Sequence, residues 1–295
     1  MLKVAPDYPE IEFISCTNQA SWNDGLDNTH NAFANIYEGR YLAGVAAGMK
    51  MQELIDNGDI TADQAVIGYV GAYSFAEVIS GFTAYYLGAK SVCPSVSMKV
   101  QFVGSWSDAT AEGNAADALC DLGCIMISQR SDNTTPATTA QSKGAFHTGY
   151  NNDMIGVAPE ASIIGTRIDW SVYFEYAIEA VVNGESFDQD WCHGMDEGAV
   201  VMTPLNEDIA AAGTAEKLAE VEEAIRTGAL QVFDTATFTV GGEEVTASFA
   251  LYTDGDFTPD SEEAVFDGAY HESYFQSAPY FALQIDGIEW LNSAF

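Results

Sequence analysis

The clearest hydrophobic pattern of the chain lies between residues 61 and 183, where short apolar runs alternate with stretches of helical spacing. The run AVIGYVGAY at 65–73 is apolar throughout and rich in β-branched and aromatic residues, which indicates a strand covered on both faces. The segment at 74–92 places its apolar residues three or four positions apart, as an amphipathic helix does. Further strands are predicted at 98–106, 124–129, 145–150 and 161–168, and further helices at 108–123, 134–144 and 170–184.

This regular alternation of strand and helix predicts an α/β fold with a parallel sheet and helices on both of its faces. In such sheets ligands bind outside the carboxyl ends of the strands. The sequence therefore predicts a binding region built from five loops, at 73–77, 105–108, 129–134, 150–154 and 168–173.

The flanks of this segment carry fewer elements. Before it, the pattern predicts a helix fragment at 2–9, a strand at 11–17 and a helix at 33–58. After it, the pattern predicts a strand at 197–205, a charged amphipathic helix at 215–228 and a hairpin at 236–247. Each flank is too small for a core of its own, so we expect the two to pair with each other.

The predicted organisation is therefore two lobes. Residues 1–60 form part of an N-terminal lobe, and residues 61–187 form a complete C-terminal lobe with the parallel sheet. Residues 188–295 return to the N-terminal lobe and add a C-terminal tail. The chain is expected to cross between the lobes near 59–64 and 184–190.

The net charge of the chain argues against two classes of binding partner. The chain has 44 Asp and Glu against 10 Lys and Arg, a formal net charge of −34. Binding nucleic acid or an anionic lipid surface requires clustered cations, so we expect neither partner. No run approaches the roughly 18 apolar residues that a membrane span requires. Hydrophobic residues make up 47% of the chain, which is enough for a buried core.

Motifs of catalysis and metal binding are missing from the sequence. Cys120 and Cys124 are the one close cysteine pair, with no second pair to complete a zinc site. Cys192 and His193 are neighbours, but a nucleophile and its base must meet in space rather than in sequence. There is no Gly-x-Ser-x-Gly turn, phosphate loop or dinucleotide fingerprint. We therefore expect no enzyme activity, no metal and no cofactor.

The five loops concentrate aromatic and short polar side chains. Rings can stack on the faces of a flat ligand, while carboxylate and amide oxygens accept hydrogen bonds from its edge. Asp108, Asp132 and Asp169 also precede helical runs, where an aspartate commonly caps the helix. We favour the cap for Asp108, and the ligand for Asp132 and Trp170. The loop side chains are Tyr73, Phe75, Glu77, Trp106, Asp108, Gln129, Asp132, Asn133, Asn151, Asn152, Asp153, Asp169, Trp170 and Tyr173.

Several phrases of the sequence resemble, in the same order, the BMP family. They are YEGRYLAGVAAG (37–48), IGYVGAYSFAEVISGFTAYYLGAKSVCP (67–94), GSWSDATAEGNAADALCDLGCIMISQRSD (104–132), GYNNDMIGVAP (149–159) and DWSVYF (169–174). This family comprises the basic membrane protein substrate-binding lipoproteins of ABC transporters, which include purine nucleoside receptors. The resemblance implies a type I periplasmic-binding-protein fold, in which two Rossmann-like lobes close on a small-molecule ligand, with an ABC transporter permease as partner.

The resemblance also implies an N-terminal truncation. Family members begin with further strand and helix units of the first lobe, so this lobe is expected to be incomplete. The export signal and a lipidated cysteine would then lie upstream of Met1, and the full-length protein would be an extracytoplasmic, cell-surface lipoprotein. A sensor that reads a ligand on the same fold without transporting it is the alternative function, and a hydrolase comes third.

Carried over by motif, the resemblance assigns the ligand side of the C-terminal lobe. The residues are Tyr73, Phe75, Glu77, Trp106, Asp132, Asn151, Asp153 and Trp170. Nucleoside-binding members resemble Gly-x-Asp-x-Asp where this chain has GYNND at 149–153, and they carry a lysine near Ile168 that is absent here. An ionised aspartate with a lysine suits a ribose diol. Their loss favours a purine nucleobase such as adenine over a nucleoside.

Overall fold

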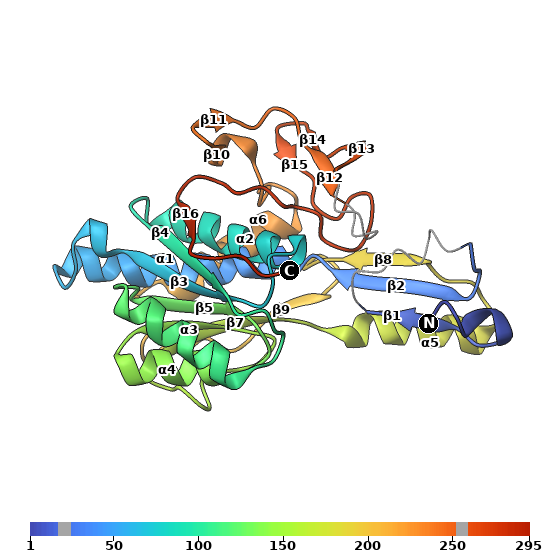
Figure 1. The fold of residues 1–295 in the computed structure, drawn as a ribbon, viewed down its shortest axis with the longest axis horizontal. Coiled ribbons are helices and arrows are strands. Elements are labelled where there is room, and N and C mark those ends of the chain that lie inside the picture. Colours follow the sequence, from blue (N-terminus) through green and yellow to red (C-terminus); the bar gives the residue numbers. More distant parts are fainter. Residues whose placement is uncertain (17–24, 252–258) are drawn as a thin grey trace.

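The chain forms two sheets of parallel strands placed end to end along its long axis (Figure 1). The computed structural model describes residues 1–16, 25–251 and 259–295. The small sheet has the order β1-β2-β8 and the large sheet the order β16-β4-β3-β5-β6-β7-β9, in which only β9 is antiparallel to its neighbour. Strands of the small sheet are β1 (Phe13–Ser15), β2 (Thr29–Ala34) and β8 (Asp190–His193).

The large sheet contains the five strands predicted between residues 61 and 183 and the strand predicted at 197–205. They are β3 (Val66–Gly71), β4 (Ser97–Phe102), β5 (Met126–Arg130), β6 (Phe146–Tyr150) and β7 (Ser162–Ile168), with β9 (Val200–Met202) and β16 (Ile288–Trp290) at its edges. The helices are α1 (Ile36–Asn57), α2 (Ala76–Val92), α3 (Ala109–Asp121), α4 (Thr135–Lys143), α5 (Trp170–Asn183) and α6 (Thr214–Arg226). In β3 all residues but Val66 are buried, because α1 and α2 cover one face of the sheet and α3 and α4 the other (Figure 1).

Short antiparallel hairpins make up much of the C-terminal segment. They pair β10 (Thr239–Val240) with β11 (Glu243–Glu244), β12 (Phe249–Leu251) with β13 (Pro259–Glu263), and β14 (Val265–Phe266) with β15 (Ala269–Tyr270). The first of them is the predicted hairpin. Gly241 and Gly242 at its turn both have positive φ, 60° and 83°, which glycine adopts without steric cost.

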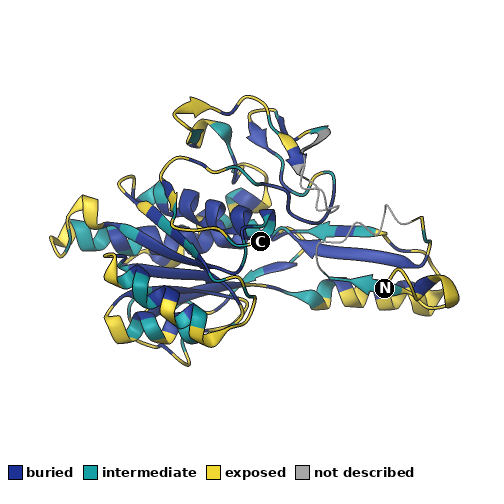
Figure 2. Ribbon diagram, in the orientation of Figure 1, coloured by how far each residue is buried: buried dark blue, intermediate teal, exposed yellow. Residues whose placement is uncertain are grey.

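Strands β2 and β8 were not predicted from the sequence pattern. The region of β2 was expected to enter a helix at 33, but α1 begins only at Ile36. All six residues of β2 are buried, including Thr29, His30 and Asn31 (Figure 2). Asn31 Nδ2 donates to Ser277 Oγ at 2.6 Å, and the His30 ring stacks on Phe187 with centroids 3.8 Å apart. The polar side chains of β2 are buried because distant residues pair with them. The strand therefore lacks the continuous apolar run from which a buried strand is predicted.

The strand pairings group the elements differently from the expected boundaries. Helix α1 packs on α2 and β7 of the large sheet rather than on the small sheet. Helix α5 lies beside the small sheet (Figure 1), where the Tyr173 ring approaches the Trp191 ring of β8 to 5.0 Å. Strands β9 and β16 join the large sheet, so among the strands of the described ranges after β7, β8 is the one that returns to the small sheet. The chain thus passes between the sheets after β2, after β7 and after β8, and we propose these as the lobe boundaries.

Within the described ranges, no helix combines the length and apolar character that crossing a bilayer demands.

His147 lies inside the large sheet as a neutral imidazole. It is fully buried in β6, with its ring nitrogens 3.1 Å from Ser162 Oγ and 3.1 Å from Gln129 Oε1. Burial, together with the positive charge of Arg40, lowers the pKa of His147 to about 3. The unfolded chain takes up this proton near a pKa of about 6.5. Stability is therefore lost as the pH falls from the unfolded pKa toward the folded one.

A His147→Gln variant isolates this effect. Between about pH 7 and about pH 4, the free energy of unfolding of the native chain is expected to fall by about 3 kcal/mol more than that of the variant. Urea titrations at both pH values measure the two losses, and contributions from the carboxylates cancel in the comparison. Equal losses in the two proteins would contradict the assignment.

Candidate functional site

A cavity of about 550 Å³ lies between the two lobes. Hollows of about 490 and 530 Å³ border α6 instead, away from the carboxyl ends of the parallel strands. Six of the eight predicted residues line the cavity between the lobes. Its lining is Cys16, Phe33, Phe75, Glu77, Trp106, Asp132, Tyr150, Asn151, Ile168 and Trp170.

The strand ends of the large sheet place most of these side chains. Phe75 and Glu77 follow β3, Trp106 follows β4, and Asp132 follows β5. Tyr150 and Asn151 stand at the end of β6. Because neighbouring parallel strands end at one edge of the sheet, residues far apart in sequence meet there. This is the edge at which the sequence predicts the binding region.

Tyr73 contacts two residues of the cavity lining. Its ring stacks on Phe75, with centroids 5.2 Å apart and planes 15° apart, and also contacts Trp106 at 5.5 Å. Tyr73 is therefore outside the lining, unlike the sequence-based assignment. Trp106 is 37% exposed, so it is not fully covered by these neighbours.

Asp132 and Asp153 differ in their surroundings, although both were assigned to the ligand. Asp153 Oδ1 accepts a hydrogen bond from Ile155 N at 2.9 Å, which turns this carboxylate toward its own loop and out of the lining. Asp132 lines the cavity, and partial burial, with the charges of Glu112 and Glu77, raises its pKa. Only one of the two carboxylates therefore faces the space where a ligand fits.

Helix capping accounts for two other loop aspartates. Asp108 Oδ1 accepts hydrogen bonds from Thr110 N and Ala111 N at 3.0 and 2.9 Å, which confirms the favoured cap of α3. Asp169 Oδ1 accepts from Ser171 N at 3.2 Å and caps α5. Trp170 is the first residue of α5, so the Asp169 cap fixes the backbone that carries this cavity-lining ring.

A buried ion pair stands behind the cavity wall. Arg130 Nη2 donates to Glu77 Oε1 at 2.7 Å, and the Arg130 side chain is completely buried while Glu77 remains 16% exposed. The Arg130 guanidinium also lies over the Tyr150 ring, 4.7 Å from its centroid. Burial raises the pKa of Tyr150 to about 12, which keeps its hydroxyl neutral. Arg130 thus holds one carboxylate and one ring of the lining in place.

Sequence reasoning missed four lining residues. Tyr150 and Ile168 were predicted as the last residues of their strands, within the loop ranges 150–154 and 168–173, but neither was assigned to the ligand. Phe33 lies in β2, the strand that the sequence concealed, and Cys16 follows β1. The rule that ligands sit beyond strand ends could have identified Tyr150 and Ile168. Nothing in the local pattern could have brought Cys16 and Phe33 to the same cavity, since they belong to the other lobe.

Comparison with known families gives this cavity a context. A sequence profile described as ABC transporter substrate-binding protein PnrA-like, of the Bmp family, matches residues 1–233. The chain belongs to the Bmp family. This confirms the family inferred from the ordered phrases at 37–48, 67–94, 104–132, 149–159 and 169–174.

Two curated proteins are similar to this Bmp-family chain. It is 34% identical over 236 residues to a purine-binding protein of Brucella abortus, covering 79% of this chain and 61% of that protein. It is 30% identical over 238 residues to a putative ABC transporter glucose-binding protein of Haloferax volcanii, covering 81% and 57%. The chain therefore spans 61% and 57% of the length of these relatives.

Solved structures agree with the two-lobed architecture. A solute-binding protein of an ABC transporter from Aeropyrum pernix matches with a TM-score of 0.61 at 17% identity, over 78% of this chain and 72% of that one. A solute-binding protein from Conexibacter woesei matches with a TM-score of 0.55 at 18% identity, over 78% and 74%. These matches confirm the type I periplasmic-binding-protein fold of this Bmp-family chain.

Proposed function

We propose that this chain is the substrate-binding component of an ABC importer and that it binds a purine nucleobase, such as adenine, between its lobes by hinge closure. The observation that carries the proposal is the cavity of about 550 Å³ between the lobes, which combines aromatic rings with two carboxylates. The rings of Phe75, Trp106 and Trp170 offer stacking surfaces, and Glu77 and Asp132 offer acceptors.

The chemistry of the lining suits a flat heterocycle with N–H groups at its edge. Stacking of a base on an aromatic ring contributes about 1–3 kcal/mol of binding free energy. Carboxylate oxygens accept hydrogen bonds from exocyclic amino and ring N–H groups, and leaving such a buried acceptor unpaired is costly, which gives selectivity. The similarity to the purine-binding protein of Brucella abortus supports a ligand of this class.

The positions at which nucleoside-binding family members are expected to contact a ribose, 149–153 and the neighbourhood of Ile168, favour a nucleobase over a nucleoside in this chain. Asn151 lines the cavity as a neutral amide, with its backbone in the left-handed region at φ 61°. Asp153 is turned toward its own loop, and the basic residue closest to Ile168 in sequence is the exposed Arg167, which contacts Asp169 at 3.6 Å. The Asp153 carboxylate and a cation next to Ile168, which could together clamp a ribose diol, are therefore both outside the described lining.

Importer function determines the partners and the location that we propose. The ligand-loaded lobes would be recognised by an ABC transporter permease, which acts at the membrane. The chain would then work outside the cytoplasm, held at the cell surface as a lipoprotein. Ligand closes the lobes because it contacts both: Phe33 and Trp170 line the cavity beside the small sheet, while Glu77 and Asp132 line it from the large one.

Calorimetry on the chain with adenine, adenosine, guanosine and glucose tests the ligand class. We expect adenine to bind most tightly and glucose not to bind. A clear preference for the nucleosides would reject the nucleobase, and binding of glucose alone would reject a purine ligand in favour of a sugar.

Two aspartate variants provide a matched pair in the same experiment. Asp132→Asn removes a charged acceptor from the lining and is expected to weaken adenine binding about 10-fold, since hydrogen bonds to charged groups contribute about 1.5–3 kcal/mol. Asp153→Asn makes the same chemical change outside the lining and is expected to leave the affinity unchanged. Equal losses in both variants would contradict the site geometry.

A further inference from the structure

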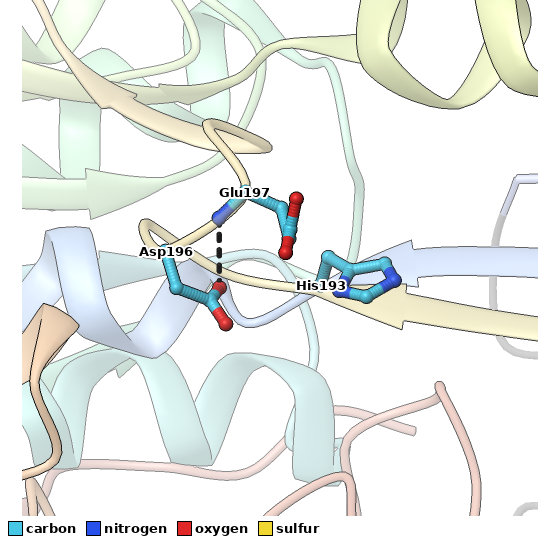
Figure 3. Close-up of side chains that lie close together, drawn as sticks. All are labelled: His193, Asp196 and Glu197. Atoms are coloured by element: carbon cyan, nitrogen blue, oxygen red, sulfur yellow. Dashed lines mark hydrogen bonds between the residues drawn. The ribbon is translucent and has the colours of Figure 1, made fainter.

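The turn that follows β8 brings three metal-binding side chains together outside the ligand cavity. His193, Asp196 and Glu197 each place one ligand atom so that all three atoms lie within 4.8 Å of one another. Figure 3 shows these side chains grouped at the turn between β8 and β9. This turn is one of the passages between the small and the large sheet. Three potential ligands thus sit on a connection between the lobes.

The imidazole distinguishes this group from the many exposed carboxylates of the chain. His193 is half-buried, and its ring contacts the Trp191 ring at 5.0 Å between centroids. Across the residues that the structure describes, no hydrogen bond is recorded for either ring nitrogen of His193, and neither Asp196 nor Glu197 forms an ion pair. A nitrogen donor and two carboxylates therefore lie close together, and no described Lys or Arg side chain is paired with either carboxylate.

Hydrogen bonds to the backbone of this turn prearrange one ligand. Glu38, at the start of α1, accepts a hydrogen bond from Met195 N at 2.7 Å with its carboxylate. Asp196 Oδ1 accepts from Gly194 N at 3.2 Å and from Glu197 N at 2.9 Å, which leaves Asp196 Oδ2 as its open ligand atom. Carboxylates that ligate a metal are commonly hydrogen-bonded through their other oxygen, and this arrangement is compatible with that role.

We propose that His193, Asp196 and Glu197 bind a divalent transition-metal ion of the Zn²⁺ class at this passage between the lobes. Imidazole nitrogen with carboxylate oxygens suits Zn²⁺ and its neighbours, whereas Mg²⁺ and Ca²⁺ prefer oxygen ligands alone. Three protein ligands leave an open position for water. The bound ion links the last residue of β8 to the turn and so stiffens a connection that must move when the lobes open and close.

The test titrates the chain with Zn²⁺ in a calorimeter, after treatment with a chelator and in excess Mg²⁺, which occupies non-specific carboxylates. We expect one saturable Zn²⁺ site whose affinity falls at least 10-fold in His193→Ala and in Glu197→Gln. The visible absorption of added Co²⁺ is expected to saturate at one ion per chain and to be lost in the same variants.

A double variant, Glu207→Gln with Asp208→Asn, is the matched control. It removes an adjacent exposed acidic pair in another loop and is expected to retain the Zn²⁺ affinity of the native chain. His193→Gln serves if His193→Ala fails to fold. Absence of saturable binding, an unchanged affinity in the His193 variants, or an equal loss in the control would each overturn the site. None of these results depends on which organic ligand fills the cavity, so the outcome is separate from that of the importer proposal.

Discussion

Replacing Arg130 with methionine is expected to abolish ligand binding and to lower the free energy of unfolding by about 3 kcal/mol. The side chain is completely buried and donates to Glu77 at 2.7 Å. Without it, the Glu77 carboxylate remains in the wall of the cavity with no partner, and the Tyr150 ring loses the cation that lies over it. Removing one member of a buried pair costs far more than the intact pair contributes, because the remaining charge is desolvated and unpaired.

Two further variants separate this effect from simple loss of volume. Adding Glu77→Gln to Arg130→Met removes the stranded charge and is expected to restore part of the stability without restoring binding. Arg167→Met is the control, because the Arg167 side chain is 47% exposed and lies 3.6 Å from Asp169, and exposed pairs contribute about 0–1 kcal/mol. Urea unfolding and calorimetry measure all three. A double variant no more stable than Arg130→Met alone would contradict the explanation.

Gly88→Ala is expected to destabilise the chain by about 3 kcal/mol, although alanine is the better helix former. A Cβ at Gly88 of α2 would lie 2.0 Å from the carbonyl oxygen of Tyr41 in α1. Gly44 of α1 faces the carbonyl oxygen of Tyr85 at the same distance, so the two helices touch backbone to backbone. Neither carbonyl can rotate away without breaking its helix, and the helices must therefore separate.

The control for this prediction is a glycine with open space around it. A Cβ at Gly156 meets no atom within 4 Å, and its φ lies outside the left-handed region. Gly156→Ala is therefore expected to change the free energy of unfolding by less than about 0.5 kcal/mol. Thermal and urea unfolding of both variants measure the difference. A Gly88→Ala variant as stable as the native chain would show that α1 and α2 are less closely packed than the structure has them.

Much of the large sheet could be predicted from the sequence because its signals are local. The apolar run at 65–73 became β3, and the helical spacing at 74–92 became α2, each within a few residues. Asp108 was favoured as a cap from its position alone and does cap α3. Strands covered on both faces need apolar side chains at every position, and such runs remain visible without any knowledge of the fold.

The small sheet could not be predicted in the same way. Strand β2 buries Thr29, His30 and Asn31, and the partners that make this possible are distant, as Ser277 is for Asn31. Burial of a polar group is tolerated only when a hydrogen bond compensates it, and such a partner cannot be read from the neighbouring residues. The sequence-based helix from 33 was therefore wrong at its start.

By itself, the sequence determined the family, the order of strands and helices through the large sheet, and the edge at which a ligand would sit. Only the tertiary structure decided that Asp132 faces the cavity while Asp153 turns to Ile155 N, and that Phe33 of the other lobe completes the wall. The physical reason is the separation in sequence between the residues that interact. Strand and helix periods arise from residues a few positions apart, whereas the surroundings of a side chain arise from segments that meet only after the sheets have formed.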